Sequence, residues 1–76
     1  MKNLTEIAIN SIATIKSFND KTVAKKLITM GVIPGREIEV LRKSPFNGAF
    51  YIRVSDLFFA IRKEEAKFII LDSSNE

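Results

Sequence analysis

The sequence predicts a mainly β protein, a small and strongly bent barrel of about five strands with one short α-helix inserted after the first strand. The chain has 76 residues, enough for one small core. Only one stretch has a clear helical pattern, and most other apolar residues lie in short, turn-bounded segments. Five short strands cannot form two packed sheets at this length, whereas a bent barrel hides their edges. We therefore expect a single domain over residues 1–76, with a frayed tail at residues 72–76.

The first elements follow from local composition. Residues 4–7 predict a short packed lead-in, and residues 12–16 predict a strand because they are rich in β-branched side chains. Asp20 is a suitable N-cap for the helix. Apolar residues then recur at helical spacing, namely Val23, Ala24, Leu27, Ile28 and Met30. We expect Leu27 and Met30 to lie in the core rather than in an interface.

Three residues are predicted to set the backbone after the helix. Gly31 stands at the C′ position, where a positive φ is needed, and Pro34 prevents the helix from resuming. Pro34 and Gly35 together match the two central positions of a type II turn. Gly31, Pro34 and Gly35 are therefore structural turn residues.

The rest of the chain has a β pattern. In the next strand, alternation places Ile38, Val40 and Arg42 on one face. Residues 43–48 contain an Asn-Gly turn signal, and the returning strand spans residues 49–54. Its alternation places Phe50, Ile52 and Val54 on one face and Ala49, Tyr51 and Arg53 on the other.

A second tight turn is predicted at residues 55–56. The strand that follows has Leu57, Phe59 and Ile61 on one face, with Phe58 pointing away from them. Residues 63–67 suit a single 3₁₀-like turn, and residues 68–71 predict the last strand.

Composition excludes most kinds of chemistry. Twelve Lys and Arg against nine Asp and Glu give a net charge of +3, and the acids and bases interleave as on an ordinary solvated surface. Without His or Cys the chain lacks a catalytic triad, an imidazole or thiolate metal site and a disulfide. We expect no catalytic residues, no bound metal, no cofactor and no small-molecule substrate. The longest apolar runs, residues 57–61 and 68–71, are too short to span a membrane, so we expect a cytoplasmic protein.

Two segments carry a resemblance to a known family. Residues 26–35 read K-L-I-T-M-G-V-I-P-G and residues 38–40 read I-E-V, which resembles the FeoA family pattern R-L-x-x-L-G-[IV]-x-P-G followed by alternating Ile or Val. Residues 51–54 and 59–69 resemble the family's ending, so the resemblance covers roughly residues 4–71. Three features depart from it: Asn10 replaces a Gly, Lys26 replaces an Arg, and Ser55-Asp56-Leu57 replaces a Gly-containing turn. Asn is the residue that best replaces Gly at positive φ.

The resemblance implies an SH3-like barrel and a function. It implies a small cytoplasmic accessory of bacterial ferrous iron uptake that acts with the membrane permease FeoB, whose own GTPase domain binds the nucleotide. The residues agree that this chain has no P-loop, since its only glycines are Gly31, Gly35 and Gly48. The same fold occurs as the C-terminal domain of iron-dependent repressors. An SH3-like regulatory domain related to these repressors is therefore an alternative function. We expect this chain not to be such a repressor, because a repressor also needs an attached winged helix.

The candidate partner-binding residues lie on the predicted hairpins. Aromatic and arginine side chains on an outer surface are the types that anchor interfaces. The candidates are Arg42, Phe46, Tyr51, Arg53 and Phe58. The alternative is that Phe46 and Phe58 fold back to cap the ends of the barrel. Weak self-association through a strand edge remains open.

A second class of function is nucleic-acid binding. Small barrels bind single strands with exposed aromatic residues between basic ones. The residues that would do so here are Arg42, Lys43, Phe46, Tyr51 and Arg53. We rank this alternative lower, because Glu37 and Glu39 lie on the neighbouring strand and the net charge is small.

Overall fold

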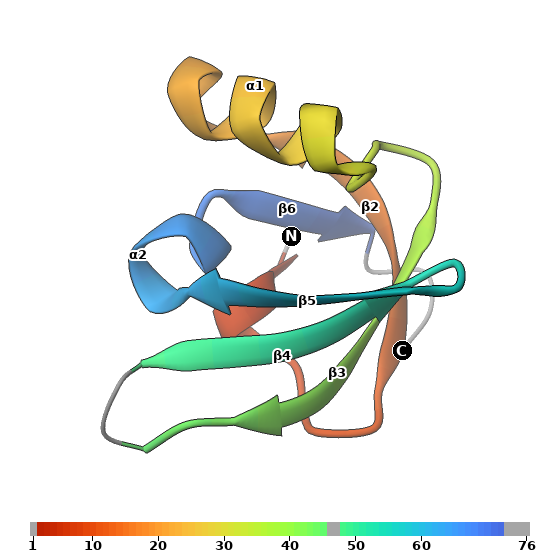
Figure 1. The fold of residues 1–76 in the computed structure, drawn as a ribbon, viewed down its shortest axis with the longest axis vertical. Helices are drawn as coiled ribbons and strands as arrows, with labels where there is room; N and C mark the ends of the chain where they lie inside the picture. Colours follow the sequence, from red (N-terminus) through yellow and green to blue (C-terminus); the bar gives the residue numbers. More distant parts are fainter. Residues whose placement is uncertain (1, 46–47, 73–76) are drawn as a thin grey trace.

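The computed structural model describes residues 2–45 and 48–72, whose six strands wrap into a small barrel (Figure 1). The strands are β1 (Lys2–Asn3), β2 (Ile12–Phe18), β3 (Glu37–Lys43), β4 (Ala49–Val54), β5 (Leu57–Arg62) and β6 (Ile69–Asp72). The helical segments are η1 (Leu4–Glu6), α1 (Lys21–Met30) and α2 (Lys63–Ala66). All neighbouring strands are antiparallel, in the order β1-β6-β2-β3-β4-β5. The predicted fold class is confirmed.

Three details differ from the sequence prediction. The sheet gains a strand because Lys2–Asn3 pairs with β6. Residues 63–66 form one α-helical turn rather than a 3₁₀ turn, since the N–H of Lys67 donates to the carbonyl of Lys63, four residues earlier. Asp72 pairs with Thr14 as the last residue of β6, so the predicted frayed tail is wrong at this position. Residues 73–76 lie outside the described residues.

The interior is filled by apolar side chains from nearly every element. On β4, Phe50, Ile52 and Val54 are buried, which confirms the predicted alternation. Leu4 from η1 and Leu27 from α1 are completely buried against the same core, and Met30 packs against it. Within residues 2–45 and 48–72 no polar or charged residue is buried. The interior of the described part of the chain is therefore apolar, and its packing stabilises the fold.

The helix begins and ends as its sequence predicts. The Asp20 carboxylate accepts a hydrogen bond from the N–H of Val23 (2.9 Å), and Gly31 ends α1 with a φ of 103°. Gly35 has a φ of 97° in a turn closed by the N–H of Arg36 and the carbonyl of Ile33 (3.1 Å). The N–H of Gly35 donates to the carbonyl of Ile15 (2.8 Å), which joins this turn to β2.

Two of the residues that depart from the family pattern adopt a positive φ. Asn10 has a φ of 72°, as expected for the best substitute for Gly. Ser55 has a φ of 57° at the first of the two residues between β4 and β5. The hairpin keeps a two-residue loop, with Val54 opposite Leu57, although no Gly is present.

One ion pair joins the two helices. The Nζ of Lys26 in α1 lies 2.6 Å from a carboxylate oxygen of Glu65 in α2. The hydrogen bond from Lys26 is the main reason that the pKa of Glu65 lies below its ordinary value. At the other end of β5, Leu57 lies beside Gly31 at the end of α1. The C-terminal part of α1 and its C-cap thus lie near the start of β5 and near α2, which follows β5.

Candidate functional site

The outer face of the barrel is formed by side chains of β3, β4 and β5 that point away from the core. Its members are Glu39, Arg42, Tyr51, Arg53, Phe58 and Ala60. The register places Glu39 opposite Arg53, and Arg53 opposite Phe58. Ile12 on β2 pairs with Glu39, so one row of side chains crosses four strands.

A β-bulge brings Arg42 to this face. Val40 pairs with Ile52 and Arg42 pairs with Tyr51, so Leu41 is an extra residue on β3. Simple alternation predicts Arg42 on the inward face of Ile38 and Val40, and that prediction is wrong. The bulge shifts the strand by one residue, and Arg42 is exposed beside Tyr51.

Two charge contacts order the outer face. The guanidinium of Arg53 forms an ion pair and hydrogen bond with the carboxylate of Glu39. The guanidinium of Arg42 lies over the Tyr51 ring, 5.5 Å from its centre, a cation–π contact. Both arginines are therefore positioned by a neighbouring strand before any partner binds.

Phe58 is the most exposed large apolar residue among the described ones. Its relative exposure is 69%, against 37% for Tyr51. Phe58 does not fold back over the end of the barrel, since it lies opposite Arg53 on the outer face. Phe46, the other aromatic candidate, lies outside the described residues. The structure thus brings Arg42, Tyr51, Arg53 and Phe58 together on one face.

Sequence reasoning missed two contributors to this surface. Ile12 is nearly half exposed and extends the row beyond Glu39, although its β-branched side chain suggests a core residue. Ala60 pairs with Tyr51 and follows Phe58 by two residues, so its small side chain is next to both aromatic residues on this face. The alternation of β5 could have predicted the position of Ala60, because residues 58 and 60 of one strand must share a face.

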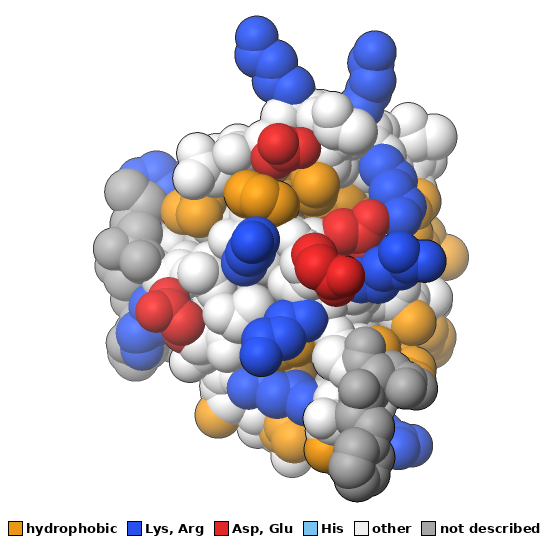
Figure 2. All heavy atoms as spheres, turned by 90° about the vertical axis from the view of Figure 1, so that its left-hand side faces the viewer, with side chains coloured by type: hydrophobic (Ala, Val, Ile, Leu, Met, Phe, Trp, Pro, Cys, Tyr) orange, Lys and Arg blue, Asp and Glu red, His pale blue; other side chains and the backbone are white. Residues whose placement is uncertain are grey.

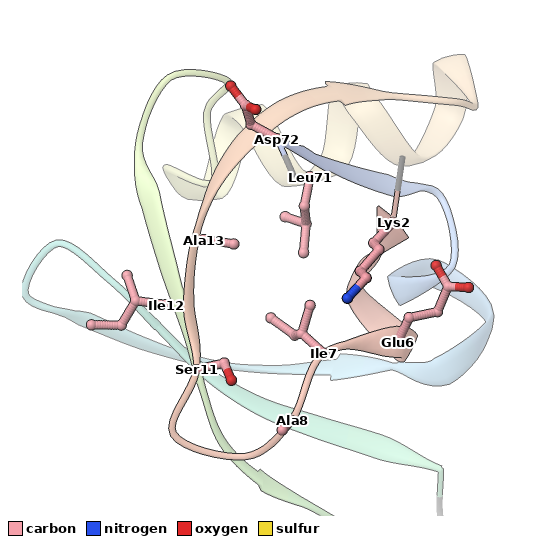
Figure 3. A pocket seen from close by; sticks show the side chains of 9 residues that line it. All are labelled: Lys2, Glu6, Ile7, Ala8, Ser11, Ile12, Ala13, Leu71 and Asp72. Carbon is pink, nitrogen blue, oxygen red and sulfur yellow. The ribbon is translucent and has the colours of Figure 1, made fainter. Parts of the chain in front are cut away.

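The described surface contains several hollows, and two of them involve β2. One, of about 270 Å³, borders the outer face and is lined by Ile12, Arg36, Glu37, Ile38, Glu39, Arg53 and Ser55. The other, of about 340 Å³, lies between η1, β2 and β6 (Figure 3). Its floor consists of Ile7, Ala13 and Leu71, with Lys2, Glu6 and Asp72 around it.

The described residues also provide no obvious metal centre. Across residues 2–45 and 48–72, no three Asp or Glu side chains gather in a group that could hold a metal ion. In the same part of the chain, no helix is long and apolar enough to cross a bilayer.

Comparison with known proteins identifies the family. Residues 2–73 match the FeoA domain model. No match was found among curated proteins. Among solved structures, the FeoA-like protein of Clostridium acetobutylicum is 28% identical, with a TM-score of 0.86 over 99% of this chain and 88% of that one.

Two further structures help to define the fold. The FeoA of Stenotrophomonas maltophilia, crystallised with zinc, is 26% identical, with a TM-score of 0.84 over 99% of this chain and 94% of that one. It is described as an SH3 domain protein and a candidate ferrous iron transport activating factor. ScaR with bound Cd²⁺ has a TM-score of 0.84 over 95% of this chain but only 34% of its own, at 16% identity, and it shares the fold alone.

These matches confirm the SH3-like fold that the sequence motifs imply. The family model covers almost the whole chain, including the helix-ending Gly31 and the Pro34-Gly35 turn. The chain belongs to the FeoA domain family.

Proposed function

We propose that this protein is a non-enzymatic accessory of bacterial ferrous iron uptake, and that it binds and modulates the FeoB permease through its outer face. Family membership and the description of the Stenotrophomonas relative as a transport activating factor support the accessory role. Action through a protein partner is the simplest mechanism for a chain whose apolar residues fill its own core.

One observation carries the choice of surface. Phe58 exposes 69% of its area from a strand that is paired along its length with β4, next to the pre-positioned Arg53 and Tyr51. Exposed aromatic and arginine residues on rigid strands lose little conformational entropy on binding. The candidate anchors are therefore Arg42, Tyr51, Arg53 and Phe58.

Capture by detergent-solubilised FeoB tests the proposal. We expect the wild-type protein to bind, and Phe58→Ala to weaken binding about tenfold, the typical effect of truncating an interface anchor. Ile28→Ala is a matched control, because Ile28 is also exposed (45%) but lies on α1. Failure of the wild-type protein to bind would refute the proposed partner. Equal binding by wild type and Phe58→Ala would refute the surface.

A further inference from the structure

Four basic side chains gather at the end of the barrel where β3 and β4 join. The β3 end supplies Arg42 and Lys43, and the β5 end with the first residue of α2 supplies Arg62 and Lys63. Lys43 pairs with Phe50, and Phe50 pairs with Ile61, next to Arg62. A Cβ atom at Gly48 would lie 3.3 Å from the Cβ of Lys63, so Lys63 lies against the hairpin. We call Arg42, Lys43, Arg62 and Lys63 the basic end.

The basic end has an excess of positive charge. The sequence from Val40 to Lys63 contains one acidic residue, Asp56, which lies in the turn at the opposite end of β4 and β5. Glu64 is exposed on α2. Glu65 is paired with Lys26, and it also accepts a hydrogen bond from the N–H of Arg62 (3.4 Å) and interacts with the charge of Arg62. No basic-end residue forms an ion pair within the described ranges, 2–45 and 48–72. Figure 2 shows basic side chains gathered low on the face that contains α2, at the height of the hairpin end in Figure 1.

The arrangement of the basic end favours a polypeptide partner over a membrane surface or a nucleic acid. Arg42 points onto the outer face over Tyr51, whereas Lys43 lies over the Phe50 ring (5.5 Å) and lines a hollow together with Lys63. The charges are thus spread around the strand ends, while a bilayer engages charges that lie in one plane. Arg42 already covers one side of the Tyr51 ring, which a nucleic-acid base would need for stacking.

The outer face continues from the basic end as an apolar strip. Tyr51 pairs with Ala60, and Phe58 lies two residues farther along β5. From Arg62 to Phe58 the distance along the strand is about 13 Å, within reach of one short segment. We infer that the basic end and this strip together form the docking site for a segment of the partner protein in which acidic residues accompany apolar ones. This inference rests on the proposed function and specifies the chemistry of the partner.

Binding of a fluorescein-labelled peptide of Glu-Glu-Leu repeats tests the inference. We expect the peptide to bind, the same repeats with Gln in place of Glu to bind more weakly, and added salt to weaken binding. The variant Arg62→Gln/Lys63→Gln should lose about fivefold in affinity, because two exposed charge contacts are removed. Lys21→Gln/Lys25→Gln is the matched control, since it removes the same charge from exposed positions on α1 and should bind as the wild type does.

Three results would overturn the inference. One is an equal loss in both double variants, which indicates attraction by net charge alone. Another is tighter binding to oligothymidylate, or to vesicles of phosphatidylglycerol and phosphatidylcholine in equal parts, than to the acidic peptide. The third is NMR shift changes that fall outside residues 42–43, 51 and 58–63.

The same variants distinguish this inference from the proposed function. If FeoB captures the wild-type protein and Arg62→Gln/Lys63→Gln equally, FeoB is supported as the partner, but the basic end is not its docking site. If FeoB captures neither protein while the acidic peptide binds the wild type, the preference of this site for an acidic and apolar segment is supported, and FeoB is not the partner.

Discussion

Single residues with a positive φ determine where this chain turns. Gly31 and Gly35 have φ values of 103° and 97°, and they bracket the segment that leads from α1 into β3. A Cβ at Gly35 would meet no atom within 4 Å. The requirement for Gly at this position is therefore conformational rather than steric, which isolates the backbone energy for measurement.

Gly35→Val should lower the free energy of unfolding by about 1 kcal/mol or more, because a β-branched residue resists positive φ. Gly35→Asn should cost less, since Asn tolerates this region, as Asn10 does at a φ of 72°. Urea denaturation followed by circular dichroism measures both. A Val variant as stable as the Asn variant would show that the turn does not require positive φ.

At this scale the sequence is a good guide, because glycine, proline and capping residues act locally. Asp20, Gly31 and Gly35 could all be predicted from their neighbours alone. Arg42 could not, since the bulge that turns it outward depends on how β3 pairs with β4. An extra residue reverses the faces of the residues after it, but the pairing partner that accommodates the bulge cannot be read from one strand.

Between elements, the pair formed by Lys26 and Glu65 connects α1 with α2. The pKa of Glu65 is lowered in the folded protein, chiefly by the hydrogen bond from Lys26. A carboxyl group whose pKa falls on folding adds stability above its unfolded pKa and loses it as the pH falls through the folded value. This contribution is therefore present at neutral pH and disappears in acid.

Glu65→Gln should reduce stability at pH 7 and have a progressively smaller effect as the pH falls through the lowered pKa of the folded protein, because the wild-type carboxyl group then takes up a proton. Glu64→Gln is the control, since Glu64 is its exposed neighbour and has no ion pair in the described part of the chain. Thermal unfolding across this pH range compares the three proteins. The interpretation would be wrong if Glu65→Gln and Glu64→Gln lost stability equally at neutral pH.

Element order was predictable, whereas contacts between elements were not. The alternation on β4 correctly separated Phe50, Ile52 and Val54 from Tyr51 and Arg53. The two-residue β1 carries no periodic signal, and its pairing with β6 joins the two ends of the chain. The Lys26–Glu65 pair spans 39 residues, so the sequence alone could not reveal it.

For the whole molecule, the distribution of residue types separates stability from function. The apolar interior accounts for the fold, and the exposed aromatic side chains of Tyr51 and Phe58 lie on the outer face beside Arg42 and Arg53. The family and its SH3-like fold followed from motifs that maintain turns and core. Those motifs do not identify a binding surface. Composition indicates which residue types could bind a partner, but only the structure shows that four of the five candidates share a face.

Ferrous iron uptake in bacterial cells that have FeoB but lack their own FeoA protein is the most direct test of the account. We expect the wild-type chain to restore uptake, and Tyr51→Ala/Phe58→Ala to fail although it accumulates and unfolds like the wild type. Both side chains are exposed on the outer face, so their loss should affect binding rather than folding. Full restoration of uptake by the double variant would contradict the claim that this face performs the function.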